Sequence, residues 1–196
     1  SMGSPNTTIE VHGPASDDVG WLNAGANIVV HGDATNGVAN AMAQGRIYVA
    51  GDIGARGMTM TKSNPRFDPP ELWVLGGVGD SFAEFMAGGI AVVCGIGSNY
   101  RKNHILGHRP CVGMVGGRTY FHGVQKSYSA ADAKLVRITD DEWEWLRAGL
   151  KDFLETIGSG YPSEELIIDR SAWQPITARH PSEKVRTRRF TMSQLR

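Results

Sequence analysis

The chain of 196 residues carries 20 basic and 20 acidic side chains, and 41% of its residues are hydrophobic. A chain of this size can bury one core with a small appendage, and none of its apolar runs approaches the roughly 20 residues that span a bilayer. Its two cysteines, Cys94 and Cys111, are too few for a disulfide framework. We therefore expect reduced thiols and a cytoplasmic protein with no membrane partner.

The N-terminal residues 1–8 are interpreted as a lead-in to the first strand. Ser1-Met2-Gly3-Ser4 is typical of a cloning remnant, and we expect no secretory signal.

From residue 9 onward, a short apolar strand ends in a glycine six times. These glycines, 19, 19, 25, 19 and 28 residues apart, are Gly13, Gly32, Gly51, Gly76, Gly95 and Gly123. The residues four and two places before the glycine are mostly apolar, as in Ile47 and Val49, and a side-chain period of two directs both toward a core. One unit cannot bury that face alone, so the units must stack.

The repeat predicts an all-β solenoid over residues 9–125. The handedness of parallel crossovers makes it a right-handed parallel β-helix of about six coils. His12 and His31, just before the first two glycines, should stack outside the core, and ordinary solvation accounts for them. The open ends of such a column make a homo-oligomer a further expectation.

Two long spacings indicate insertions near Thr59–Glu71 and Ser98–Cys111. Insertions in repeat proteins emerge as loops on one side, which is often the binding side. The second insertion contains the candidate interface or anion-binding residues Tyr100, Arg101, Lys102, His104, His108 and Arg109. Guanidinium groups suit carboxylates and phosphates, while a solvated loop and a protein contact remain alternatives.

The second insertion also contains residue types that bind zinc, in His104, His108 and Cys111. However, Gly107 and Pro110 oppose a helix that would present both histidines on one face, and no fourth ligand is evident. We therefore predict no metal site.

Residues 126–177 are interpreted as a helical appendage. Thr139 and Glu142 form a capping box, and Gly158 is a natural stop. Between them, a stripe at helical spacing consists of Trp143, Leu146, Leu150, Phe153, Leu154 and Ile157. We expect this stripe to cover the outward residues of the repeat, such as Tyr48, Trp73 and Tyr120; coverage by a second protein is the alternative.

Residues 178–196 form a basic tail, with Arg179, Lys184, Arg186, Arg188, Arg189 and Arg196 against Glu183. A solvated terminus is the first interpretation. A docking arm for a protein partner is the second, and nucleic acid is disfavoured.

The repeat resembles a known family at specific positions. Gly32-Asp33, Gly37, Met42 and Gly45-Arg46-Ile47-Tyr48-Val49-Ala50-Gly51, and again Gly79, Met86, Gly89 and Gly95, follow the pattern of the GXGXG domain family. That family forms the C-terminal β-helix of the glutamate synthase large subunit and recurs as a separate subunit of formylmethanofuran dehydrogenase. The resemblance implies a structural element with no catalytic, cofactor-binding or metal residues of its own.

Other chemistry is disfavoured by the local pattern. Gly76-Gly77-Val78-Gly79 does not open a helix as a dinucleotide fingerprint does. The chain also contains no G-x-S-x-G elbow of a serine hydrolase.

Three hypotheses follow. The first is a noncatalytic subunit of a glutamate-synthase-like oxidoreductase of glutamate biosynthesis, between glutaminase-like and FMN-binding synthase-like partners, with FMN and an iron–sulfur cluster held by those partners. The second is the corresponding subunit of a formylmethanofuran dehydrogenase or formyltransferase/hydrolase type complex. The third is a stand-alone small-ligand binder or enzyme that uses the second insertion.

Overall fold

The computed structural model describes residues 6–99, 103–158, 160 and 163–184. Its eight strands are β1 (Thr8–Val11), β2 (Ala24–Val30), β3 (Gln44–Val49), β4 (Glu71–Val74), β5 (Ala87–Val93), β6 (Gly116–His122), β7 (Ala133–Leu135) and β8 (Trp173–Ala178). The helices are α1 (Asp140–Thr156) and α2 (Ser163–Ile168), with 3-10 turns at Arg170–Ala172 and Pro181–Glu183. None of the helices within these described ranges is long and apolar enough to cross a membrane.

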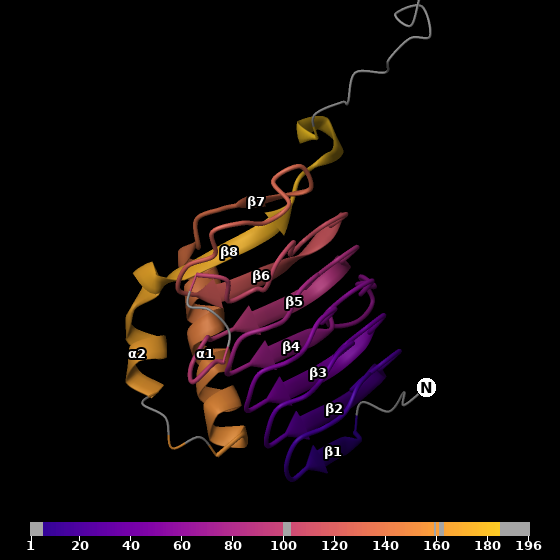
Figure 1. The fold of residues 1–196 in the computed structure, drawn as a ribbon, viewed down its shortest axis with the longest axis vertical. Coiled ribbons are helices and arrows are strands. Elements are labelled where there is room, and N and C mark those ends of the chain that lie inside the picture. Colours follow the sequence, from indigo (N-terminus) through magenta and orange to yellow (C-terminus); the bar gives the residue numbers. More distant parts are fainter. Residues whose placement is uncertain (1–5, 100–102, 159, 161–162, 185–196) are drawn as a thin grey trace, which may run out of the picture.

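All eight strands form one sheet in the order β1-β2-β3-β4-β5-β6-β8-β7. The first six are parallel and follow the chain, so Figure 1 shows them as a stack from β1 to β6. Equivalent residues of the repeat are in register: Ile28 pairs with Ile47, and Ile47 with Leu72. The strand positions and register expected from the glycine spacing are therefore confirmed.

The predicted fold class, an all-β solenoid in the form of a right-handed parallel β-helix, is wrong. The sheet is single and mixed, because β8 pairs antiparallel with both β6 and β7. Among the described residues, the segments between the parallel strands contribute isolated bridges such as Ala34 to Ile53 and single backbone hydrogen bonds, but no further strand of a second sheet. A stack ending at β6 would leave a row of unpaired backbone groups along the edge of β6. Strand β8 forms hydrogen bonds with these groups. It lies within residues 126–177, which were expected to form only a helical appendage.

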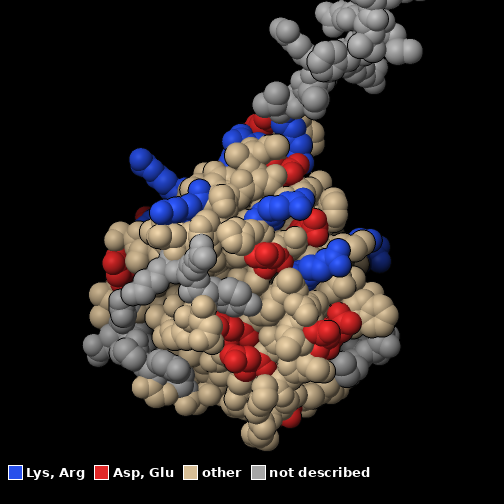
Figure 2. Space-filling model, in the orientation of Figure 1, with Lys and Arg blue, Asp and Glu red and all other residues tan. Residues whose placement is uncertain are grey.

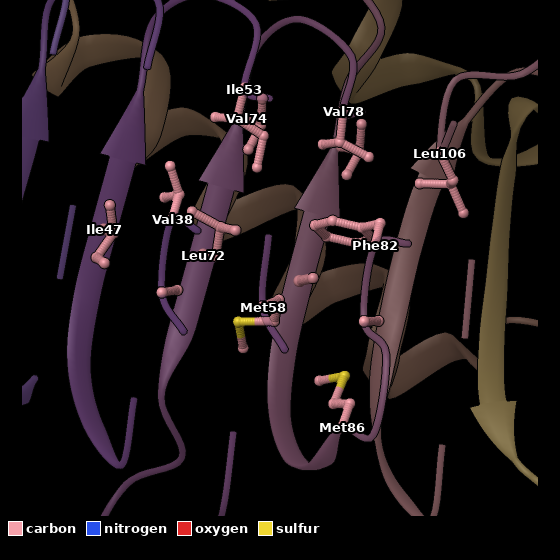
Figure 3. Packing of buried hydrophobic residues seen from close by; sticks show 14 of the residues in the cluster. Val38, Ile47, Ile53, Met58, Leu72, Val74, Val78, Phe82, Met86 and Leu106 are labelled. Atoms are coloured by element: carbon pink, nitrogen blue, oxygen red, sulfur yellow. The ribbon is translucent and has the colours of Figure 1, made fainter. Parts of the chain in front are cut away.

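The main core lies between the parallel strands and the segments that connect them. Figure 3 shows Ile47, Leu72 and Val74 of the strands together with Val38 and Phe82 of the connecting segments. All five side chains are buried. The residues four and two places before each glycine thus enter the core, as the period of two predicted.

Helix α1 begins and ends where the sequence indicated. The Thr139 side chain accepts a hydrogen bond from the backbone N–H of Glu142, and the Glu142 carboxylate accepts from the backbone N–H of Thr139, which completes the capping box. Gly158, just beyond the C-cap, adopts a φ of 63°, a conformation that glycine tolerates best.

The apolar face of helix α1 covers the outer face of the sheet, as expected. Phe153 packs edge-on against Tyr48, and Trp145 lies against the rings of Trp73 and Tyr120. Trp73 and Phe153 are almost fully buried. This second core joins the helix to β3, β4 and β6, and Figure 1 shows α1 standing across those strands.

Three of the glycines that end the strands, Gly32, Gly51 and Gly76, are needed for close approach of the units. A Cβ on Gly32 would lie 2.8 Å from the carbonyl carbon of Gly13, and one on Gly76 would lie 2.8 Å from the carbonyl oxygen of Gly51. Neither Gly32 nor Gly76 has a positive φ. At these two strand ends the close spacing of the stacked backbone, and not a left-handed conformation, requires glycine.

Candidate functional site

Short polar side chains connect each unit to the next along the turn after the strand. Asp33 accepts a hydrogen bond from the backbone N–H of Asp52 (2.8 Å), and Asp52 accepts one from the backbone N–H of Gly77 (2.7 Å). A parallel row runs from Asp17 to the N–H of Asn36, and from Asn36 Oδ1 to the N–H of Ala55. These carboxylates and amides are therefore engaged in holding the stack together.

Asp52 also anchors the second insertion. Its other carboxylate oxygen accepts a hydrogen bond from the backbone N–H of Asn99 at 2.8 Å, although the two residues are 47 positions apart. The Asp52 side chain therefore satisfies two backbone N–H groups from different units, and the residue is only 9% exposed.

Replacing Asp52 by Ala should destabilise the protein by about 2 kcal/mol, because two N–H groups lose their acceptor in a largely buried setting. Urea unfolding followed by circular dichroism measures the change. The matched control is Asp80→Ala, which removes an exposed carboxylate that accepts from the single N–H of His108 and should cost less than half as much. Equal losses in the two variants would contradict this account of Asp52.

The structure places only part of the predicted interface set. Tyr100, Arg101 and Lys102 lie outside the described residues. The rings of His104 and His108 lie 4.9 Å apart, and Arg109 is exposed with a φ of 54°. Their role as an interface therefore stays a prediction.

The zinc ligands considered in the second insertion do not come together in the described part of the chain. The only group of three such ligands found there is Glu10, His12 and His31. Cys111 is buried, and burial with the nearby charge of Asp132 raises the pKa of its thiol to about 12. Burial also raises the pKa of the Cys94 thiol. Neither thiol is a ready nucleophile at neutral pH.

A groove of about 900 Å³ opens at the starts of β2 and β3 beside the first insertion. Gly25, Asn27 and Gln44 line its sheet side, and residues 65–69 form its other wall. Phe67 within that wall is 55% exposed. The groove presents strand backbone, amide groups and one aromatic ring, a combination suited to a polar chain or a small ligand.

Arg46 also lines this groove, and its guanidinium group is paired with carboxylates. Its Nε donates to Glu71 at 3.0 Å, and its Nη1 donates to the Tyr48 hydroxyl and to Asp152 of α1. Burial alone would lower the pKa of Arg46, but the Glu71 carboxylate and the Tyr48 hydroxyl together outweigh it, and the pKa is raised. Burial and the hydrogen bond to Asp152 raise the pKa of Tyr48. This network fixes α1 to the sheet.

The turns opposite the strands contain an unusual backbone pattern. Three alternate residues in each of the first five units have positive φ, and in the third and fourth units these are Arg56, Met58, Met60, Ser81, Ala83 and Phe85. Such a conformation costs a residue other than glycine roughly 1–2 kcal/mol. Hydrogen bonds between units hold it, such as those from the Met60 N–H to Glu84 and from the Phe85 N–H to Val112.

This pattern brings large apolar side chains to the surface in a row. We define the apolar stripe as Leu22, Ala41, Met60 and Phe85, which occupy the same position in four successive units. Leu22, Met60 and Phe85 are 47%, 55% and 56% exposed. Surfaces of soluble proteins rarely leave such apolar side chains contiguous unless they contact something.

Sequence reasoning missed both the stripe and the groove. The stripe had a signal: Leu22, Ala41 and Met60 are 19 residues apart, and Phe85 follows after 25, as in the glycine series. The groove had a weaker signal in the sequence. This signal was the insertion near Thr59–Glu71, but the residue types of the insertion did not indicate a ligand.

Charge is distributed unevenly over the surface. In the face shown in Figure 2, Lys and Arg side chains gather toward the upper end of the molecule, while acidic side chains predominate below. Several of the basic groups near β7 are paired: Lys134 with Glu183, and Lys184 with Asp132. The hydrogen bond from the Gly113 N–H, aided by Ser129 and Lys184, lowers the pKa of Asp132. The basic tail beyond Lys184 lies outside the described residues.

Comparison with protein families gives one match. The model of the family described as the GXGXG motif covers residues 44–175, well over half of the chain. Comparison with curated proteins finds no match.

Proposed function

This chain belongs to the GXGXG motif family, and from that premise we propose that it is a noncatalytic scaffolding subunit of a cytoplasmic complex of the glutamate synthase type. In this proposal the chain holds a glutaminase-like subunit against an FMN-binding synthase-like subunit. FMN and an iron–sulfur cluster belong to those partners, and this chain contributes rigid surface.

The apolar stripe is the observation that carries the proposal. Met60 and Phe85 are adjacent in register, since the Met60 N–H donates to the carbonyl of Glu84, and both are more than half exposed. The residues are held in left-handed backbone by the stack, so the surface is preorganised and loses little entropy on binding. Helix α1 already covers the opposite, outer face of the sheet, whereas Leu22, Met60 and Phe85 of the stripe stay exposed.

The polar side chains support a structural role. Asp33 and Asp52 accept backbone N–H groups of the following units, and Arg46 is neutralised by Glu71 and Asp152. Both thiols are buried. These carboxylates and this guanidinium group are thus engaged in holding the fold.

The groove beside the first insertion favours a second candidate function, the binding of a small ligand. Its volume of about 900 Å³ lies in the range of ligand pockets. This candidate requires binding by the isolated chain.

Affinity capture of the tagged full chain from its native cells tests the proposal, with co-purified proteins identified by mass spectrometry and flavin by fluorescence. We expect a glutaminase-like protein and an FMN protein. An amidohydrolase-like protein with molybdenum or tungsten would replace the proposal by the formylmethanofuran dehydrogenase type. Turnover of a substrate by the purified chain alone would contradict both.

A pair of variants links the complex to the stripe. Met60→Glu combined with Phe85→Glu should abolish co-purification, because two charges would enter an apolar contact, while circular dichroism stays native. The control is Ile168→Glu on α2, an apolar residue that is more exposed than Met60 or Phe85 and should leave assembly intact. Light scattering of the isolated chain shows whether a second copy of the chain, and not a different protein, covers the stripe.

A further inference from the structure

We infer that Glu10, His12 and His31 form a binding site for one divalent transition-metal ion, of the class of Zn²⁺, on the open outer face of β1 and β2. One ligand atom from each of these residues lies within 4.8 Å of the others. This site is separate from the stripe and from any role of the chain as a scaffold.

The sheet itself brings the three side chains together. Glu10 and His12 are two residues apart on one chain segment and therefore point to the same side. His31 lies beside His12, because Val11 pairs with Val30 and the His31 N–H donates to the Val11 carbonyl at 2.9 Å. The register that builds the core thus also fixes the spacing of the ligands.

The observed geometry places the three ligands near one another, and the imidazole rings must tilt to bind an ion. The two imidazole rings are stacked with centroids 5.1 Å apart and planes within 5°, and His12 Nε2 lies 3.5 Å from Glu10 Oε2. Bonds of about 2.0–2.1 Å in a tetrahedral site place ligand atoms roughly 3.3 Å apart. The carboxylate and His12 are already near this spacing, and a tilt of the exposed His12 ring and the half-buried His31 ring toward each other brings in His31.

Exposure permits this adjustment. The side chains of His12 and Glu10 are 77% and 51% exposed, so their rotation disturbs the stacking of the two imidazole rings but no core packing. The aromatic contacts of α1 fall on β3, β4 and β6. Val29 of β2 is buried in the same cluster, but Glu10 and His12 beside it are exposed and accessible to an ion.

The surrounding charge favours a cation. Residues 6–45 contain the carboxylates of Glu10, Asp17, Asp18 and Asp33 and no Lys or Arg. Two imidazoles and one carboxylate select Zn²⁺, Co²⁺, Ni²⁺ or Cu²⁺ over Mg²⁺ and Ca²⁺, which prefer all-oxygen sites. Three protein ligands leave a fourth position for water.

Isothermal titration of the full chain with ZnCl₂ tests the site. We expect one Zn²⁺ per chain, at least tenfold weaker binding in His12→Ala combined with His31→Ala, and a smaller loss in Glu10→Gln. The matched control is His108→Ala, which removes one ring of the other close histidine pair and should leave the titration unchanged. Equal binding by the wild type and the double variant would overturn the inference.

X-ray absorption at the zinc edge gives an independent readout of the ligands. We expect two imidazoles with oxygen ligands. A sulfur ligand would assign the ion to a cysteine and overturn the site, and so would a Glu10→Gln variant with unchanged affinity and an unchanged spectrum, since the carboxylate would then not coordinate.

Discussion

Gly79→Ala should destabilise the protein by about 3 kcal/mol or more. A Cβ at this position would lie 2.7 Å from the backbone nitrogen of Ala55 and 2.7 Å from the carbonyl carbon of Gly54. Both are main-chain atoms, so no side chain can rotate away. The units would have to separate there, which weakens the hydrogen bond from the Gly79 N–H to Ile53 and its neighbours. Urea unfolding monitored by circular dichroism measures the loss.

The control for this variant is Gly160→Ala, where the added Cβ meets nothing within 4 Å. Its free energy of unfolding should stay within about 0.5 kcal/mol of the wild type. If Gly79→Ala were as stable as this control, the close approach of the stacked backbones would not explain the glycine.

Phe153→Ala should cost about 4 kcal/mol, because truncation of a fully buried aromatic side chain removes its transfer energy and leaves a cavity. The ring is 0% exposed and packs against Tyr48 at 5.0 Å and Trp73 at 6.0 Å between centroids. Loss of the ring loosens α1 from β3 and β4. Urea unfolding gives the free energy, and tryptophan fluorescence reports the surroundings of Trp73.

Lys151→Ala is the matched control on the same helix. Lys151 is exposed, and alanine preserves helix propensity, so the change should stay within about 0.5 kcal/mol. A loss in Phe153→Ala no larger than this would mean that α1 contributes little to the stability of the sheet.

Much of the local structure was predictable because it depends on short-range periodicity. The glycine spacing located the parallel strands and their register, including the in-register pair Ile28 and Ile47. Thr139, Glu142 and Gly158 located the ends of α1. The stacking of His12 and His31 followed from the same alignment.

The predicted solenoid failed where a distant segment changed the sheet. β8 is more than 50 residues after β6 in the chain, yet Phe121 pairs with Gln174. No period connects the two segments, because the pairing arises from the open edge that β6 leaves after the parallel stack ends. A repeat pattern carries no information about that edge.

The candidate functional residues also include some that the sequence indicated and some that only the structure revealed. His104, His108 and Arg109 were selected for their chemistry, which a sequence displays, and their function stays a prediction. Leu22, Met60 and Phe85 became notable only when left-handed backbone turned them outward in a row. Glu10 became a candidate metal ligand only because the structure places it beside His12 and His31.

The sequence by itself determined the repeating units, their parallel register and the helix that covers them, since hydrophobic period, glycine position and capping chemistry are local properties. Only the tertiary structure decided that the sheet is mixed, which apolar residues stay exposed, and which polar side chains converge. Those outcomes depend on unpaired strand edges and on contacts between segments that are distant in the sequence. Such contacts form, and contribute to stability, only in the folded chain.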